Sequence, residues 1–366
     1  MGRRHRALGG LGPAVMKFAD PTYWRGRRVL VTGHTGFKGA WLSLRLRALG
    51  AEVTGLALTP PTTPSLFDLA GLSTSVQDLR ADIRDFAATR RAVDAARPQI
   101  VFHLAAQSLV KVGFDAPLDT LDVNVMGAAR VFEALRPHAP EAVVAITSDK
   151  VYLNKDTGRA FAEDDALGGS DPYSGSKSAA EMAIRIWRES FALPLVAARA
   201  GNVVGGGDFA AARLLPDLWR GFERNEPLVM RRPGATRPWT HTLDVAEGYL
   251  LYAEAVAAHR KDLPWTLNFG PDPAAAPLTV LETATAFAEA AGRPLNWRAD
   301  PDPFPEKTAL AIDSRLARKT LDWSERFPGR AGVSEAGTWY RAWADGADTR
   351  RLSEDHARLY AAEHAA

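Results

Sequence analysis

The feature that most constrains this chain is a glycine-spaced turn directly after a short apolar run. Residues 28–32 read Arg-Val-Leu-Val-Thr, and a helical segment begins after the turn Gly33, His34, Thr35, Gly36, Phe37, Lys38 and Gly39. Glycines at this spacing let backbone amides approach a phosphate, which the N-terminus of the next helix stabilises. At a first strand-to-helix turn, the pattern predicts a dinucleotide site that uses all seven residues.

Short apolar runs and helical segments alternate through the first half of the chain. This alternation predicts an α/β fold with a doubly wound parallel sheet of the Rossmann type. We expect strands at 28–32, 52–58, 100–104, 142–147 and 195–198, and helices at 38–49, 85–96, 119–136 and 173–191.

Clusters of glycine and proline become frequent after about residue 200, which predicts a smaller, loop-rich substrate lobe. We therefore expect a disordered extension over 1–21, a dinucleotide-binding domain over 22–200 and a substrate lobe over 201–366. Some segments of the lobe are expected to return to the first domain. Met16 is an alternative start, and the tail 346–366 is expected to dock as a terminal helix without chemistry.

Charge and composition exclude several classes of function. The 366 residues include 45 Lys and Arg against 43 Asp and Glu, so bulk nucleic-acid binding is disfavoured. The chain has no cysteine, which excludes disulfides, thiolate metal ligands and a cysteine nucleophile, and we expect no metal site. No run approaches the roughly 18 consecutive apolar residues of a membrane span. These features predict a cytoplasmic protein with no membrane partner.

Other predicted strand ends supply residues that can line a dinucleotide. The second strand ends near Thr59, where neither the acid that favours NAD nor the arginine that favours NADP is present. Asp82, followed by Ile83, can accept a hydrogen bond from the adenine amino group. A helix N-cap by Asp82 or Asp85 is an equally good and compatible interpretation. A further strand closes with residues that can lie against the cofactor: Leu104, Ala105, Ala106 and Gln107.

A Tyr-x-x-x-Lys pair follows the fourth strand. Tyr173 and Lys177 are four residues apart and share a helix face, where an ammonium beside a phenol favours the phenolate. Tyr173 can then take the proton of a substrate hydroxyl while a hydride leaves the same carbon for a nicotinamide. Lys177 is also expected to bind the nicotinamide ribose. Ser148, at the end of the fourth strand, can hold the reacting oxygen against Tyr173.

Together these motifs resemble the extended short-chain dehydrogenase/reductase superfamily, in its NAD-dependent epimerase/dehydratase family. Five segments, at 33–39, 147–150, 171–174, 199–203 and 237–239, are similar to the CDP-glucose 4,6-dehydratases, and the resemblance runs from about residue 22 to the tail. It implies oxidation at carbon 4 of the sugar, loss of the carbon 5 proton and the carbon 6 hydroxyl, and return of the stored hydride to carbon 6. NAD would stay bound throughout. It also implies a homodimer built from helices 119–136 and 173–191.

The resemblance gives the two residues after Ser148 a role in elimination. Asp149 is expected to be the acid for the departing hydroxyl. Lys150 stands where dTDP-glucose relatives carry Glu, and it can be a base only if its pKa is lowered. The alternatives are that Lys150 stabilises the enolate, or that both residues form a solvated loop pair.

A nucleotide diphosphate needs cations and amides from the second half of the chain. The resemblance implies that Arg213 and Arg237 meet the nucleotide and its phosphates. The other candidates for substrate or phosphate contacts are Gln107, Arg199, Asn202 and Lys307. A competing interpretation is a nucleotide-sugar 4-epimerase, which needs no acid/base pair after the serine. Another is a non-catalytic NAD-binding regulator, a class that commonly lacks the tyrosine or the lysine.

Overall fold

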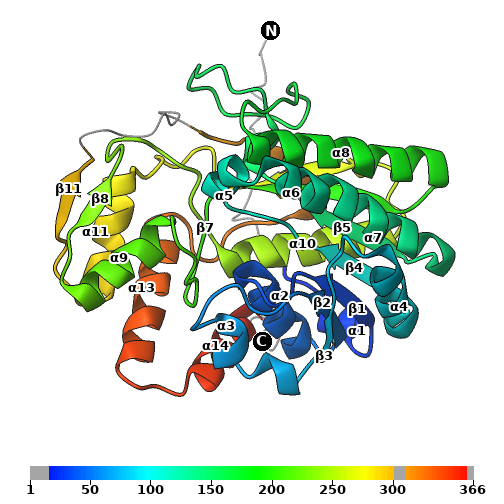
Figure 1. Ribbon diagram of the computed structural model, residues 1–366, viewed down its shortest axis with the longest axis horizontal. Coiled ribbons are helices and arrows are strands. Elements are labelled where there is room, and N and C mark those ends of the chain that lie inside the picture. The colour runs from blue at the N-terminus through cyan, green and yellow to red at the C-terminus, as the bar shows by residue number, and fades with distance from the viewer. Residues whose placement is uncertain (1–15, 301–309, 361–366) are drawn as a thin grey trace, which may run out of the picture.

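A seven-stranded parallel sheet forms the centre of the computed structural model, which describes residues 16–300 and 310–360 (Figure 1). Its strand order is β10-β6-β5-β4-β1-β2-β3. The strands are β1 (Arg28–Thr32), β2 (Glu52–Ala57), β3 (Gln77–Arg80), β4 (Ile100–His103), β5 (Ala142–Ile146), β6 (Leu195–Ala200) and β10 (Thr266–Phe269). From β1 the chain first adds strands on one side, β2 and β3, and then adds β4 and the later strands on the other side. Doubly wound sheets bind ligands at this point, where the strand order reverses. The predicted fold class is confirmed.

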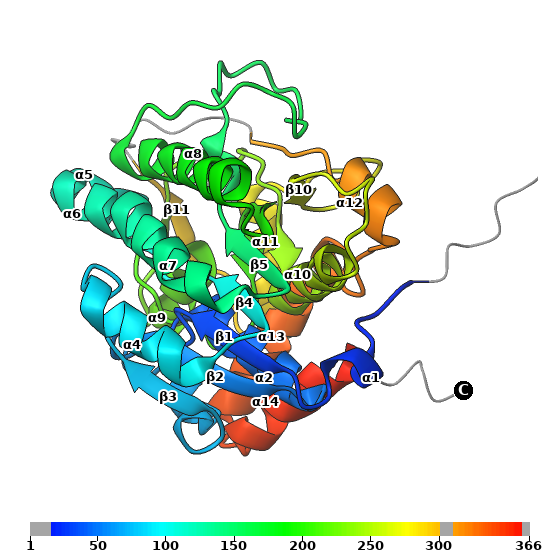
Figure 2. The ribbon, with the colours of Figure 1, turned by 90° about the vertical axis from the view of Figure 1, so that its right-hand side faces the viewer.

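Helices cover both faces of the sheet, so the strands are apolar on both sides (Figure 2). Val29 and Val31 of β1 pack against one layer, and Leu30 between them packs against the other. The first layer contains α2 (Phe37–Ala48), α10 (Thr242–Ala257) and α12 (Arg315–Leu321), and the second contains α4 (Phe86–Ala96), α7 (Ala128–Leu135) and α8 (Pro172–Phe191).

The helix predicted over 119–136 is confirmed as continuous helical backbone, but a π-helical turn interrupts its α-helical pattern. The chain forms α6 (Pro117–Leu121), a π-helical turn η2 (Asp122–Gly127) and then α7. Such turns often occur at functional sites because they re-aim side chains. Here η2 carries Asn124, whose side chain is buried and contacts the loop after β4.

The two ends of the described chain pack onto the sheet domain. Phe18 and Ala19 are buried and α1 (Pro21–Trp24) follows, so the predicted disordered extension over 1–21 ends too late; residues 1–15 lie outside the described residues. At the other end α14 (Thr349–Arg358) docks against α2, where the rings of His356 and Trp41 stack. Residues 361–366, the last part of the predicted terminal helix, also lie outside the described residues.

Several elements after residue 200 form an aromatic-rich body, at the left of Figure 1, whose core also includes residues of α2 and of α3 (Leu66–Leu69). It contains α9 (Leu214–Arg224), α11 (Val280–Ala290), α13 (Arg330–Ala344) and the two-stranded sheet of β8 (Leu228–Met230) with β11 (Trp297–Ala299). By contrast, β10 and α10 belong to the central sheet and its covering layer. The remaining elements are η1 (Leu72–Thr74), α5 (Val110–Asp115), η3 (Arg136–His138), η4 (Asp149–Val151), β7 (Val203–Val204) and β9 (Thr240–His241).

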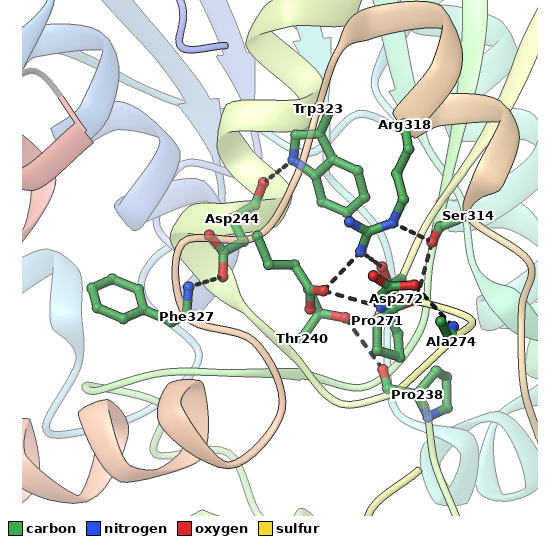
Figure 3. A network of polar contacts seen from close by, with 12 residues as sticks. Pro238, Thr240, Asp244, Pro271, Asp272, Ala274, Ser314, Arg318, Trp323 and Phe327 are labelled. Carbon is green, nitrogen blue, oxygen red and sulfur yellow. Dashed lines mark hydrogen bonds and ion pairs between the residues drawn. The ribbon is translucent and has the colours of Figure 1, made fainter. Parts of the chain in front are cut away.

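A buried carboxylate fixes the start of α10. Asp244 accepts hydrogen bonds from the Arg326 and Phe327 amides at 2.7 and 3.2 Å, and its carbonyl accepts one from the Trp323 ring nitrogen at 2.9 Å (Figure 3). Burial raises the pKa of Asp244 to about 6. Because α10 directly follows β9, this network also anchors the preceding segment that carries Arg237.

Candidate active site

The glycine turn after β1 accepts no larger residue at two positions. Gly33 has φ +78°, and an added Cβ would lie 2.7 Å from the Ala105 backbone nitrogen. An added Cβ at Gly39 would overlap the Gly33 carbonyl. Gly36 is the N-cap of α2, and Thr35 donates a hydrogen bond to the Leu58 carbonyl at 3.0 Å. The turn is therefore a backbone cradle at the N-terminus of α2, the arrangement that binds a pyrophosphate.

Several side chains predicted to contact the cofactor are already engaged by the protein. His34 is buried, hydrogen-bonds Asp78 at 2.8 Å and presses on Gly55, so only its backbone can serve the cradle. Burial lowers its pKa, because the charged ring would be desolvated. Asp82 pairs with Arg84 at 2.6 Å, and this partner lowers the pKa of Asp82.

Of the two aspartates predicted as possible helix N-caps, Asp82 and Asp85, only Asp85 caps a helix. Asp85 accepts from the Ala88 amide at 3.0 Å and caps α4. Ile83 is buried against Gly127, which explains the small residue at that point of η2. Leu104 and Ala105 lie against Gly33 at the end of β4, and Ala106 and Gln107 continue that loop.

Sequence analysis missed a cation at the end of β2. Thr59, predicted as a cofactor contact at this uncharged strand end, is exposed there. The structure brings Arg80 of β3 beside it, where Nη1 donates to the Leu58 carbonyl at 2.6 Å. Asp78 pairs with the same guanidinium at 2.7 Å and balances its charge.

Ser148, Asp149 and Lys150 form a turn shortly after β5, in which Ser148 and Asp149 are buried and Lys150 is partly exposed. Ser148 Oγ donates to Asp149 Oδ1 at 3.0 Å, and Lys150 Nζ lies 3.4 Å from the same oxygen. The Asp149 side chain is only 1% exposed, which contradicts a solvated loop pair. Its other oxygen, Oδ2, is buried and has no hydrogen-bond partner among the described residues. One carboxylate oxygen is thus held by the turn and the other is left for a ligand.

The phenol of Tyr173 meets this turn. Burial raises the pKa of Tyr173, and the Lys150 ammonium and the nearby Ser148 hydroxyl oppose that rise. The prediction gave the opposing charge to Lys177. The structure differs: Lys177 Nζ donates to the Ile146 carbonyl at 3.2 Å, and the charge that most lowers the pKa of Tyr173 is that of Lys150.

The charge states of the two lysines follow from their surroundings. Burial lowers the pKa of Lys177 to about 8, against the attraction of Glu181. Burial also disfavours the charge on Lys150, but Asp149 and Tyr173 outweigh it and raise the pKa of Lys150 above its ordinary value. Lys150 therefore stays protonated near neutral pH, which argues against its use as a base.

The site carries a surplus of positive charge. Burial lowers the pKa of Lys38 to about 7, and the neighbouring charges of Lys177 and Arg213 lower it further. Lys150 and Arg237 also repel one another. Cations gathered around one carboxylate are stabilised when an anionic ligand binds, and phosphate groups meet this need.

A family profile described as "NAD dependent epimerase/dehydratase family" matches residues 29–267. The chain belongs to this family. It is 38% identical over 343 residues to CDP-glucose 4,6-dehydratase of Salmonella typhimurium, covering 90% of this chain and 94% of the relative. This similarity confirms the resemblance predicted from the motifs. A UDP-glucose 4-epimerase of Mycolicibacterium smegmatis is 25% identical over 319 residues, 86% of this chain and 98% of the relative.

Solved structures agree with this assignment. The UDP-glucose 4-epimerase of Thermus thermophilus, in complex with NAD, superposes with a TM-score of 0.73 at 26% identity, covering 88% of this chain and 99% of that chain. The cofactor of the family is NAD, as predicted, and the cradle at Gly33 and Gly39 fits its pyrophosphate.

The predicted substrate residues differ in how the structure uses them. Gln107 donates to Thr120 at 2.9 Å and accepts from the Leu109 amide at 2.5 Å, so its side chain is engaged within the protein. Asn202 Oδ1 is buried without a partner among the described residues, which suits a ligand contact. Arg213 pairs with Asp208 at 2.9 Å and is half-buried at the site.

The three remaining candidate cations, Arg237, Arg199 and Lys307, differ in where the structure places them. Arg237 is buried, and Nη1 donates to the Thr236 carbonyl at 2.7 Å. Arg199 is wrong as a ligand candidate, because it is fully buried in an ion pair with Glu181. Lys307 lies outside the described residues. In the described ranges no group of three or more His, Asp or Glu side chains could hold a metal ion. No helix of these ranges is both long and apolar enough to cross a membrane.

Proposed function

We propose that this family member is a nucleotide-sugar 4,6-dehydratase that converts CDP-glucose to CDP-4-keto-6-deoxyglucose for deoxysugar and lipopolysaccharide synthesis. The observation that carries the proposal is the Asp149–Lys150 pair beside Tyr173, in which the carboxylate side chain is 1% exposed and the lysine side chain 32% exposed. An epimerase needs no such pair, and a silent regulator needs neither it nor the Tyr173–Lys177 couple. The similarity to the Salmonella CDP-glucose 4,6-dehydratase supports the choice of sugar nucleotide.

Oxidation at carbon 4 would be the work of Ser148 and Tyr173. NAD, held by the glycine cradle, supplies the chemistry of accepting and returning a hydride. Tyr173 takes the proton of the carbon 4 hydroxyl, and Ser148 holds the same oxygen. The Lys150 ammonium and the nearby Ser148 hydroxyl both favour the phenolate. Lys177 has donors to spare after binding the Ile146 carbonyl and can hold the nicotinamide ribose.

Elimination would depend on the different surroundings of the two oxygens of the Asp149 carboxylate. Because Oδ1 accepts from Ser148 and Lys150, Oδ2 is the oxygen that can carry a proton to the departing carbon 6 hydroxyl. The carbon 5 proton can pass to Asp149 Oδ2 and from there to the carbon 6 hydroxyl, which leaves as water. Until that hydroxyl leaves, the electron pair of the broken C–H bond places negative charge next to the new ketone. The Lys150 ammonium is placed to stabilise that charge, since its pKa is raised. We therefore assign Lys150 the role of electrostatic stabiliser.

A panel of sugar nucleotides tests the proposed function. Purified protein is incubated separately with CDP-glucose, dTDP-glucose, UDP-glucose and GDP-mannose, and the 4-keto-6-deoxy product is followed by its absorbance in alkali. We expect turnover of CDP-glucose above all others. A carbon 4 epimer without a ketone would indicate the epimerase, and no conversion of any sugar would indicate the regulator.

We also propose a homodimer through the helices beside α8. Leu118 of α6 is 81% exposed, and Met126 of η2 and Met182 and Ile186 of α8 are about half exposed, although all are large and apolar. These helices lie side by side on one surface (Figure 2). Exposed apolar patches of this kind mark interaction sites. The cytoplasmic location, the absence of membrane and nucleic-acid partners and the domain boundary at residue 200 stay predictions.

The dimer prediction can be tested by placing a charge on this surface. Ile186→Glu is expected to shift the molar mass in solution from two chains to one, because an unpaired carboxylate would be buried in the interface. Light scattering after size exclusion measures this. Val229→Glu, at an exposed apolar residue of β8, is the matched control and should leave the mass unchanged. A monomeric parent protein would contradict the prediction.

A further inference from the structure

Two side chains of α8, one helical turn apart, hold the end of β5. Lys177 Nζ donates to the Ile146 carbonyl at 3.2 Å, and Glu181 accepts from the Thr147 hydroxyl at 2.8 Å. Ser148 is the next residue. The last residue of β5 and the residue that follows it are therefore both attached to the helix that carries Tyr173.

Arg199 of β6 holds Glu181 in place and reaches the far side of the same turn. Its Nε and Nη2 bind the two Glu181 oxygens at 2.8 and 2.5 Å. Its Nη1 donates to the Tyr152 hydroxyl at 2.8 Å, and this hydroxyl donates to Asn268 at 2.6 Å. Thr147 precedes the turn and Tyr152 follows it, so a single ion pair is attached to both of its ends.

The burial of this ion pair is not explained by stability alone. Both side chains are at most 1% exposed. Burying two charges costs desolvation energy that their attraction often fails to exceed, and well-packed apolar residues can replace such pairs without loss. What the pair provides here is a fixed geometry, because Glu181 accepts from Thr147 before the turn and Arg199 donates to Tyr152 after it, while Arg199 also donates to the Glu163 carbonyl at 3.0 Å.

We propose that the Glu181–Arg199 pair is the positioning unit of the 148–151 turn, acting on Ser148 through Thr147 and on Lys150 through Tyr152. The inference rests on the dehydratase reaction proposed above. Glu181 and Arg199 touch no reacting atom and are positioning residues. Displacing a catalytic group by about 1 Å can cost on the order of 100-fold in rate, so two anchors on such a short turn are chemically significant.

The test removes each anchor without disturbing the ion pair. Thr147→Val and Tyr152→Phe each delete one hydroxyl and leave the side-chain shape nearly unchanged. Thr283→Val and Thr285→Val are the controls, since each deletes a hydroxyl that donates at 2.8 Å to a backbone carbonyl of its own helix, α11. The measurements are kcat and KM for the sugar nucleotide, with the thermal midpoint of each variant.

We expect Thr147→Val and Tyr152→Phe each to lower kcat by about tenfold, the effect of one lost hydrogen bond to a charged group, with KM within about twofold of the parent. The controls should keep the parental kcat at similar thermal midpoints. Parental kcat in both anchor variants, or losses equal to those of the controls, would overturn the inference. A parent enzyme that converts no sugar nucleotide would instead overturn the proposed function, so the two failures are distinguishable.

Discussion

Lys150→Ala is expected to slow the overall dehydration by about 10²- to 10³-fold, the loss typical of removing one preorganised stabiliser of developing negative charge. Reduction of bound NAD by CDP-glucose should remain measurable, because Ser148, Tyr173 and Lys177 are still present. The variant would then accumulate the oxidised sugar. Stopped-flow absorbance of NADH follows the first step, and the alkali absorbance of the product follows the second.

The same variant should alter the pH dependence of oxidation. The Lys150 ammonium is the leading influence that lowers the pKa of Tyr173 against burial. Without it the pKa of Tyr173 rises, and oxidation should need a more alkaline pH than in the parent. Lys155→Ala, at an exposed position of the same loop, is the control and should leave both steps unchanged. Full dehydration activity in Lys150→Ala would remove this lysine from the mechanism.

Gly33→Ala is expected to weaken NAD binding by at least about 100-fold, a loss of about 2.7 kcal/mol. The added Cβ would lie 2.7 Å from the Ala105 backbone nitrogen, and φ at this position is +78°. The turn and the end of β4 must therefore separate, which opens the cradle. Isothermal titration of the purified variant with NAD measures the change.

Gly26→Ala is the control that distinguishes the effect of backbone strain from the effect of opening the cofactor cradle. Gly26 also has positive φ, +71°, but an added Cβ would meet no atom within 4 Å. This control should lose about 1 kcal/mol of stability from the left-handed backbone and keep NAD affinity. Equal affinity in both variants would show that Gly33 does not shape the cofactor site.

Much of the fold was predictable because its signals are local. The run 28–32 is apolar, ends at a glycine turn and is β1 with the same bounds. By contrast, β3 reads Gln-Asp-Leu-Arg at the sheet edge and shows no apolar run. β10 comes from a part of the chain rich in glycine and proline, and only its pairing with β6 identifies it. The π-helical turn η2 likewise depends on packing between Gly127 and Ile83.

The site shows the same division between local and tertiary signals. Spacing placed Tyr173 and Lys177 on one helix face, and the structure brings Tyr173 to Ser148 and Lys150. The sequence spacing could not show that Lys150 carries the charge acting on Tyr173, because that contact joins two segments that are distant in the sequence. Glu181 was missed for the same reason, although its position four residues after Lys177 was a signal that it shares this face.

The most direct test of the central claim is the fate of a label. CDP-glucose carrying deuterium at carbon 4 is converted to completion by the parent enzyme, and the product is analysed by NMR and mass spectrometry. If the Asp149–Lys150 turn and Tyr173 act on one sugar ring, the deuterium is found at carbon 6 of a 4-keto product. Deuterium retained at carbon 4, in a product that keeps its carbon 6 hydroxyl, would contradict the account.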